Sequence, residues 1–353
     1  MSLDEDWATF MTDGIIATEV KQPTTIEKAP EPSKLHISTQ TKIAYLNTEI
    51  DINHLFWNLP IIEFHHSATG ILKKQMKLTT LTLEDTQKYE ELIKDHYNGV
   101  LENISLKTEP YKCVQKASIG LSNKDVIGFK YSNNKRAFYN CVAIVMRILN
   151  NDTYKEFHLK IFNTGKMEIP GIRESHSIYI ALDEFMKVLR NFYPDVKYTT
   201  TIRTILINSN FNTGYDIDRQ KCFNVLKSKY NMIAMYDPCL YPGVQCKFYY
   251  NKLHKTQDGL CRCKKRCGKR GTGDGENQCK EISFMIFRTG SILIVGNCEE
   301  AQLREIYDVL KVIFYNEYAS IFSEEADVDD SKTTYTSSTS FSRKYRSKVM
   351  YVK

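Results

Sequence analysis

The sequence contains two divergent copies of one pattern, and this duplication restricts the fold more than any other feature. Each copy has a hydrophobic strand, the motif Ile-Phe-x-Thr-Gly at residues 161–165 or 286–290, a second strand and an amphipathic helix. β-branched and aromatic residues around each motif favour strands, and the glycine permits a hairpin with positive φ. Two such units predict an α+β fold with pseudo-twofold symmetry.

The same repeat extends upstream of each hairpin. Asp51 and Asp218 each precede a short apolar stripe, so each is predicted to cap a helix. A strand is predicted before each cap, at 37–46 and at 202–207. After each hairpin, apolar residues recur at helical spacing, namely Ile178, Leu182, Phe185 and Leu189 in one copy and Leu303, Ile306, Leu310 and Phe314 in the other. The predicted half-repeat is therefore strand, helix, three strands and helix.

The remaining segments are two tails and two insertions. The tails lack the periodic apolar pattern of packed elements, and we expect them to be disordered. The predicted boundaries are a tail at 1–34, a first half-repeat at 35–195 with an insertion at about 65–137, a second half-repeat at 196–322 with a Cys-rich basic insertion at about 249–281, and a tail at 323–353.

Composition excludes some classes of protein. The net charge of +6 permits a polyanionic partner without requiring one. The acidic N-terminus is unlike a secretory signal, and no apolar run is long enough for a membrane span. We therefore expect an intracellular protein whose ten cysteines are free thiols or metal ligands. No catalytic constellation is evident, so we expect no enzymatic activity.

The second insertion carries a cysteine cluster. Cys261, Cys263, Cys267 and Cys279 are candidate ligands of a structural Zn²⁺, because four thiolates complete a tetrahedral site. Free thiols or redox chemistry are the alternatives, since the spacing is not a paired Cys-x2-Cys pattern. The same loop is rich in Lys and Arg. It is either a solvated basic loop or an additional phosphate contact.

Three segments carry a resemblance to a known family. They read Ala-Ile-Val-Met-Arg-Ile at 143–148, Ile-Phe-Asn-Thr-Gly-Lys-Met-Glu-Ile-Pro-Gly at 161–171, and Tyr-Asp-Pro-Cys-Leu-Tyr-Pro-Gly at 236–243. In this order, and duplicated, they resemble the TATA-box-binding protein family over roughly residues 35–64 and 138–320. The long insertions and tails resemble those of TATA-binding-protein-like proteins of large DNA viruses.

The resemblance implies a saddle, in which one curved antiparallel sheet carries helices on its convex face. The concave face of such a saddle sits on the minor groove of DNA, and paired Phe side chains wedge into base steps and kink the duplex. It also implies that the Cys-rich insertion falls in a stirrup loop at one end of the DNA-binding face.

The resemblance assigns the wedges residue by residue. Phe162 and Phe287 match one wedge of each half, and Tyr241 stands at the second wedge of the second half. Cys141 stands at the second wedge of the first half, unless a slip of the strand brings Phe138 or Tyr139 there. Each of these aromatic residues also has a plainer interpretation, as a core or turn residue of its strand.

Polar positions match less well. Thr39 and Thr204 replace the central Asn pair that reads A·T edges. The matched phosphate-contacting positions are Arg147, Lys166, Arg173 and Lys247. The departures are Ser291 and Cys298, which replace basic residues, and Pro170 and Val295, which replace small groove-facing Thr residues. The pattern therefore favours minor-groove binding with bending over strict TATA preference.

The predicted function is that of a monomeric transcription initiation factor that binds A·T-rich promoter DNA in the nucleus, a viral factory or a virion. Its implied partners are a transcription-factor-IIB-like protein and the RNA polymerase machinery. The first would dock near Asp237, where Cys239 replaces a Glu of the family. The alternative is an interaction scaffold that kept the saddle but lost specific DNA binding.

Overall fold

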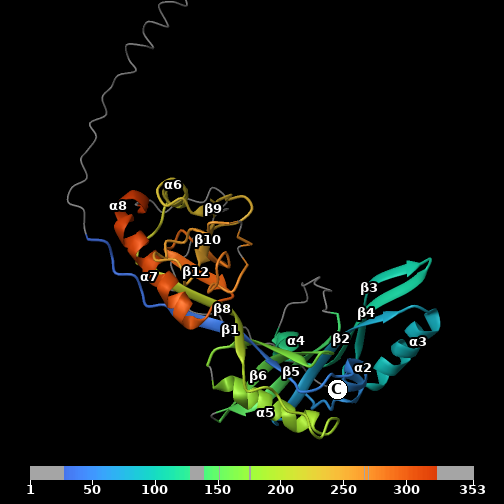
Figure 1. Cartoon of the computed structure of the whole chain (residues 1–353). Coiled ribbons are helices and arrows are strands. Elements are labelled where there is room, and N and C mark those ends of the chain that lie inside the picture. Colours follow the sequence, from blue (N-terminus) through green and yellow to red (C-terminus); the bar gives the residue numbers. More distant parts are fainter. Residues whose placement is uncertain are drawn as a thin grey trace, which may run out of the picture.

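The computed structural model describes residues 28–127, 139–150, 152–174, 176–265, 267–268 and 270–323. Twelve strands of these residues form one antiparallel sheet in the order β3-β4-β2-β5-β6-β7-β1-β8-β12-β11-β10-β9 (Figure 1). Residues 1–27 and 324–353 of the predicted tails lie outside the described residues. None of the helices in the described part has both the length and the apolar character that crossing a bilayer requires.

The elements follow the chain in two sets. The first set is β1 (His36–Tyr45), α2 (Ile52–Asn58), β2 (Gly70–Thr80), α3 (Leu83–Leu92), η1 (Ile93–Asp95), β3 (Val100–Thr108), β4 (Tyr111–Gly120), α4 (Asn123–Ile127), β5 (Cys141–Asn150), β6 (Thr153–Phe162), β7 (Lys166–Ile172) and α5 (Ser177–Leu189). The second set is β8 (Arg203–Asn212), α6 (Arg219–Ser228), β9 (Ile233–Met235), β10 (Val244–Tyr250), β11 (Lys280–Ile286), β12 (Ser291–Gly296), α7 (Glu300–Asn316) and α8 (Tyr318–Ile321).

The predicted α+β class and the pseudo-twofold sheet are confirmed. β1 and β8 pair antiparallel at the centre, with Thr41 opposite Leu206. Outward from this pair, β7, β6, β5 and β2 on one side correspond to β12, β11, β10 and β9 on the other. The repeated unit thus has five strands, one more than predicted, and the first half carries β3 and β4 in addition. The short β9 has only three residues, too few to show an alternating pattern in the sequence.

The four helices that the sequence predicts are present as α2, α5, α6 and α7. The Asp51 carboxylate accepts from the backbone N–H groups of Asn53 and His54 and caps α2, and Asp218 accepts from Lys221 N and caps α6. These bonds satisfy amide donors that have no partner within the helix. The predicted apolar stripes of α5 and α7 are buried in two separate cores, one in each half.

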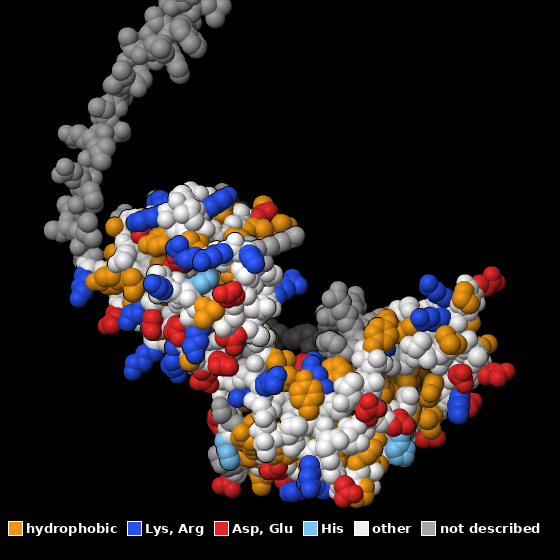
Figure 2. Space-filling model, viewed as in Figure 1, with side chains coloured by type: hydrophobic (Ala, Val, Ile, Leu, Met, Phe, Trp, Pro, Cys, Tyr) orange, Lys and Arg blue, Asp and Glu red, His pale blue; other side chains and the backbone are white. Residues whose placement is uncertain are grey.

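The sheet has one covered face and one open face. In β6, Leu159 and Ile161 are buried, whereas His158, Lys160 and Phe162 between and beyond them are partly exposed. Because side chains alternate between the two faces of a strand, the exposed set lies opposite the packed helices. We call this open side the inner face. Figure 1 shows α5 and α7 on the outer sides of the two lobes, and Figure 2 shows the hollow between the lobes.

Two expectations about the flanking segments change. Residues 65–137 hold β2, α3, η1, β3, β4 and α4, and β3 and β4 extend the sheet beyond β2. Part of the predicted N-terminal tail is held against the sheet, at Pro32 and Ser33. The Ser33 N–H donates to the Asn212 carbonyl at 2.8 Å, the Ser33 hydroxyl accepts from Asn212 N, and Pro32 is buried. These bonds satisfy backbone groups at the end of β8.

A buried lysine links β2 to the end of α2. Lys74 is 1% exposed, and its Nζ donates to the carbonyl of Leu59 at 2.7 Å and to that of Trp57 at 3.4 Å. Carbonyls at a helix C-terminus attract a cation. Burial nevertheless disfavours the charged form and lowers the pKa of Lys74 from 10.5 to about 8.

We predict that Lys74 makes stability depend on alkaline pH. The folded state releases the Lys74 proton near pH 8 and the unfolded state near pH 10.5, so unfolding takes up a proton in between and raising the pH stabilises the fold. The free energy of unfolding, measured by urea denaturation, should rise by roughly 2–3 kcal/mol between pH 8 and pH 10.5 relative to Lys74→Met. A difference between the two proteins that does not change with pH would contradict the assignment.

Candidate nucleic-acid interface

In the second half, two aromatic rings meet at one end of the inner face. Tyr241 lies just before β10 and Phe287 just after β11, and their ring centres are 6.0 Å apart at an interplanar angle of 58°. Gly243 lies between them. A Cβ on Gly243 would come within 3.1 Å of both rings. The glycine therefore gives the two rings the room to approach each other.

In the first half, the register changes the expected partner of Phe162. Val142 pairs with Ile161 as Val244 pairs with Ile286, so the residue equivalent to Tyr241 is Tyr139. The alignment that put Cys141 at this position is therefore off by two residues. A shift of two residues leaves every side chain on the same face of the sheet. The alternation of apolar and polar residues in the sequence therefore does not reveal it. Phe138, the other alternative, lies outside the described residues.

Tyr139 and Phe162 each lie against a lysine. The Lys77 Nζ is 3.3 Å from the Tyr139 ring centre, and Tyr139 is 61% exposed. The Lys166 Nζ is 5.3 Å from the Phe162 ring centre. Cys141, opposite Phe162, is buried, and burial raises the pKa of its thiol to about 11, so the thiol is neutral. Lysines over aromatic faces thus place positive charge directly beside both rings at this end.

At the centre of the sheet, Asn208 supplies a side-chain amide, the group that Thr39 and Thr204 do not have. Thr39 pairs with Asn208, whose Nδ2 donates to the Thr39 hydroxyl at 3.1 Å, whereas Thr204 pairs with Lys42. Sequence reasoning missed Asn208. Its signal was an alternation in β8, in which Asn208, Asn210 and Asn212 are partly exposed and Ile207, Ser209 and Phe211 are buried.

The inner face of the second half is mostly uncharged. Strand pairing aligns Asn208 with Val295 and Ser283, and in the next row Asn210 with Leu293. The further partly exposed residues of these rows are Met285, Gln245 and Lys247. Small, uncharged side chains suit close approach to a groove floor, where no phosphate lies.

The predicted phosphate-contacting residues lie in different settings. The Arg147 Nη1 donates to the carbonyls of Phe64 and His66, both at 2.8 Å, so this side chain holds the loop after α2. Lys247 is bound to Glu281 at 2.8 Å and to the Ser283 hydroxyl at 2.9 Å. The others are Lys166, which is partly exposed beside Phe162, and Arg173, which is exposed. Ser291 is partly exposed, whereas Cys298 is buried and does not reach the surface.

A short helix crosses the inner face of the first half. Asp125 of α4 is paired with Lys73 of β2 at 2.6 Å, and the Asn123 N–H donates to Glu156 of β6 at 2.9 Å. Lys124 lines a cavity of about 340 Å³ together with His158, Lys160, Ala143, Val145 and Pro170 of the inner face. Figure 1 shows α4 on the side of the sheet opposite α5. The first half is thus partly covered where the second is open.

The four predicted metal ligands come together. The sulfurs of Cys261, Cys263, Cys267 and Cys279 all lie within 4.8 Å of one another, and the cluster could hold a metal ion. The insertion that carries them joins the Tyr250 end of β10 to the Lys280 end of β11. Tyr241 and Phe287 lie at the other end of this hairpin. The expected stirrup position is therefore wrong, because the insertion stands where the first half joins the paired residues Asn150 and Thr153 of β5 and β6.

These features define a protein class: a two-lobed antiparallel sheet with helices on its outer side and a paired aromatic site on its inner face. No family model matches the chain. It is 25% identical over 185 residues to a TATA-box-binding protein-like protein of Acanthamoeba polyphaga mimivirus, a match that covers 48% of this chain and 46% of that protein. This match confirms the resemblance seen in the repeat motifs, and it spans about half the length of the curated relative.

A solved structure also matches. Methanococcus jannaschii TBP has a TM-score of 0.41 and 12% sequence identity, and the match covers 80% of this chain and 99% of that chain.

We predict that Asp125 holds α4 in place. Burial opposes ionisation, but hydrogen bonds from Lys73 and Ser122 outweigh it and lower the pKa of Asp125. The contact is therefore present at neutral pH and is lost as the pH falls through this lowered pKa. Asp125→Asn should speed amide hydrogen exchange at residues 122–127 at neutral pH. Asp85→Asn, on α3, is the matched control, and equal exchange in the two variants would exclude the anchor.

Proposed function

We propose that this chain binds double-stranded DNA through the minor groove and bends it, as a transcription initiation factor at A·T-rich promoters. The observation that carries the proposal is the pair of Tyr241 and Phe287 at the edge of a mostly uncharged inner face. The curated relative's name, TATA-box-binding protein-like, supports the same reading. The proposed role involves no catalysis.

The mechanism follows from the chemistry of the pair. Aromatic or apolar wedges between base steps cost a few kcal/mol of stacking per step and gain a bent duplex with more contact surface. Phe287 and Tyr241 form such a wedge at one end, and Phe162 with Tyr139 forms the other. Amide and hydroxyl groups of Asn208 and Thr39 lie between them, and each can bond to the acceptors of A·T pairs.

The two halves contribute unequally in this proposal. The minor groove can bind directly to the open inner face of the second half. In the first half, α4 must move away before the groove can bind. Lysines beside Phe162 and Tyr139 then contact phosphate. Release of counterions by these residues makes binding fall with salt. The fall distinguishes the proposal from the alternative, a scaffold that kept the fold without binding DNA.

We predict that Phe287→Ala and Tyr241→Ala reduce bending more than they reduce affinity. Loss of one ring should decrease the bend angle, measured by energy transfer between dyes at the ends of an A·T-rich duplex, and weaken binding roughly tenfold, which is about 1.4 kcal/mol. Phe223→Ala, on α6 away from the inner face, is the control. An unchanged bend angle would remove the wedge assignment, and salt-independent or absent binding by the wild type would favour the scaffold.

The loop before β10 is the proposed docking site of a transcription-factor-IIB-like protein. Leu240 is 84% exposed and Cys239 is exposed, while Asp237 accepts from the Cys239 N–H at 3.0 Å and holds the loop in shape. An exposed leucine on an ordered loop suits a protein partner. Recruitment of the polymerase machinery would follow this contact.

We predict that Leu240→Ser abolishes a ternary complex without changing DNA affinity. Mobility-shift assays with the DNA, this chain and a factor-IIB-like protein from the same source measure both quantities. Leu253→Ser, an exposed leucine on another loop, is the control. A ternary complex of unchanged affinity in Leu240→Ser would move the docking site elsewhere.

A further inference from the structure

We propose that Cys261, Cys263, Cys267 and Cys279 bind one Zn²⁺ ion, and that this ion is the folding core of the insertion at residues 251–279. A tetrahedral ion with Zn–S bonds of about 2.3 Å requires sulfurs about 3.8 Å apart. The Cys279 sulfur is 3.7 Å from that of Cys261 and 3.3 Å from that of Cys263. The four sulfurs already converge around one point.

Disulfides do not explain this geometry. A disulfide needs sulfurs about 2.05 Å apart and uses two cysteines. Here Cys279 contacts two different sulfurs, and no disulfide joins any of the four cysteines. Four thiolates with no oxygen ligand favour Zn²⁺ over Mg²⁺ or Ca²⁺. A set of four protein ligands also closes the coordination sphere, so the site is structural and leaves no position for a substrate.

The insertion has no other source of stability on the scale of a core. Its described residues form no helix or strand, and those that are buried are Asn251, Gly259, Gly273 and Cys279. No aliphatic or aromatic side chain is among them. Leu260, partly buried against the core of the second half, contributes only one such side chain. The entropy cost of ordering the segment therefore needs another favourable term, and a metal supplies it in small modules.

The buried side-chain amide of Asn251 lies beside the cysteine cluster, where it can hydrogen-bond to a ligand sulfur. Asn251 is 1% exposed, and its Nδ2 lies 3.9 Å from the Cys279 sulfur and donates to the Gly275 carbonyl at 3.0 Å. Its Oδ1 accepts from the Leu253 N–H at 3.0 Å. Asn251 thus links the end of β10, one thiol and the far side of the loop. Donors to metal-bound sulfur orient the ligand and reduce its charge.

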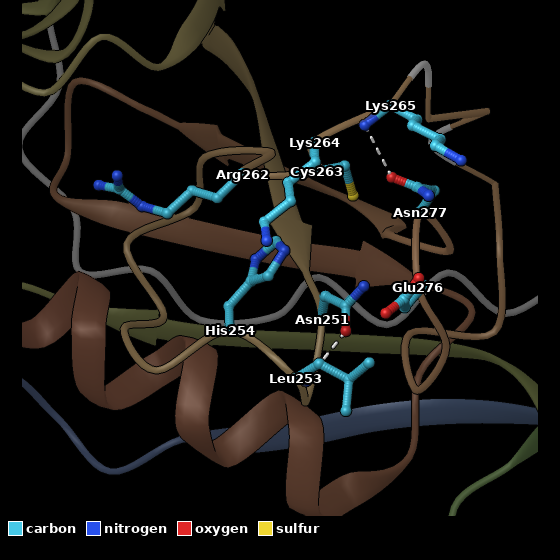
Figure 3. A pocket seen from close by; sticks show the side chains of 9 residues that line it. All are labelled: Asn251, Leu253, His254, Arg262, Cys263, Lys264, Lys265, Glu276 and Asn277. Atoms are coloured by element: carbon cyan, nitrogen blue, oxygen red, sulfur yellow. Dashed lines mark hydrogen bonds between the residues drawn. The ribbon is translucent and has the colours of Figure 1, made fainter.

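The charge around the cluster also fits. Zn²⁺ with four thiolates carries a net charge of about −2. Arg262, Lys264 and Lys265 alternate with the cysteines, and Figure 3 shows them with Cys263 along the wall of the adjoining cavity of about 240 Å³. Arg262 is also paired with Asp258. The basic loop, which the sequence leaves as either solvated or phosphate-contacting, thus lies beside the cysteine cluster. The proposal is independent of DNA binding.

The first experiment is metal analysis of the full chain, expressed with zinc and iron available and purified without chelator. We expect one zinc per chain by mass spectrometry of the metal content. Cys263→Ser and Cys279→Ser should each lose at least tenfold in zinc affinity, measured by competition with a chromophoric chelator. Cys239→Ser, which removes an exposed cysteine outside the cluster, should keep the full content.

Two further measurements distinguish metal coordination by these cysteines from a general loss of stability in the variants. Cobalt substitution should give the absorption bands of a tetrahedral thiolate site in the wild type and in Cys239→Ser. Chelation should open residues 251–279 to protease while the rest of the chain stays protected. Iron at one per chain, an oxidised cluster under reducing purification, or no bound metal in the intact wild type would each overturn the proposal.

Discussion

The antiparallel pairing of β1 with β8 is the contact on which the rest of the structure depends. It joins two half-sheets, each with its own apolar core, into one sheet of twelve strands. The Gln40 amide of β1 also donates to Glu300 at the start of α7, at 2.8 Å. This bond links the first half to the outer helix of the second half. Since strand pairing fixes which side chains face inward, one ladder determines the composition of the whole inner face.

That inner face is duplicated in architecture and unequal in chemistry. The second half presents a close aromatic pair and uncharged groups. The first presents lysines beside its aromatic residues, with α4 lying across the strands. Two of the basic side chains of the first half already have partners within the protein. Arg147 binds two carbonyls of the loop after α2, and Lys160 is paired with Glu168 at 2.8 Å. The inner face therefore offers two different surfaces, one open and one partly covered by α4.

The insertions add stability in two distinct ways. The first one buries apolar side chains, among them Ile93 and Ala117, and lengthens the sheet by β3 and β4. The second has no fully buried aliphatic or aromatic side chain in its described part, and it brings four thiols together beside the buried Asn251. Lengthening a loop adds little to the entropy cost of closing it. Holding the longer loop in one conformation, however, needs a specific interaction.

The sequence by itself determined the duplication, the helix caps at Asp51 and Asp218, the faces of α5 and α7 and the four cysteines as a set. These are local or periodic properties, so they are visible in residue order. Only the tertiary structure decided that Tyr139 corresponds to Tyr241, that Asn208 meets Thr39, that α4 crosses the inner face, and that the Cys-rich insertion lies away from the aromatic pair. The physical reason is that strand register and loop placement are set by contacts between residues distant in the chain, and a shift of two residues preserves every face pattern that a sequence displays.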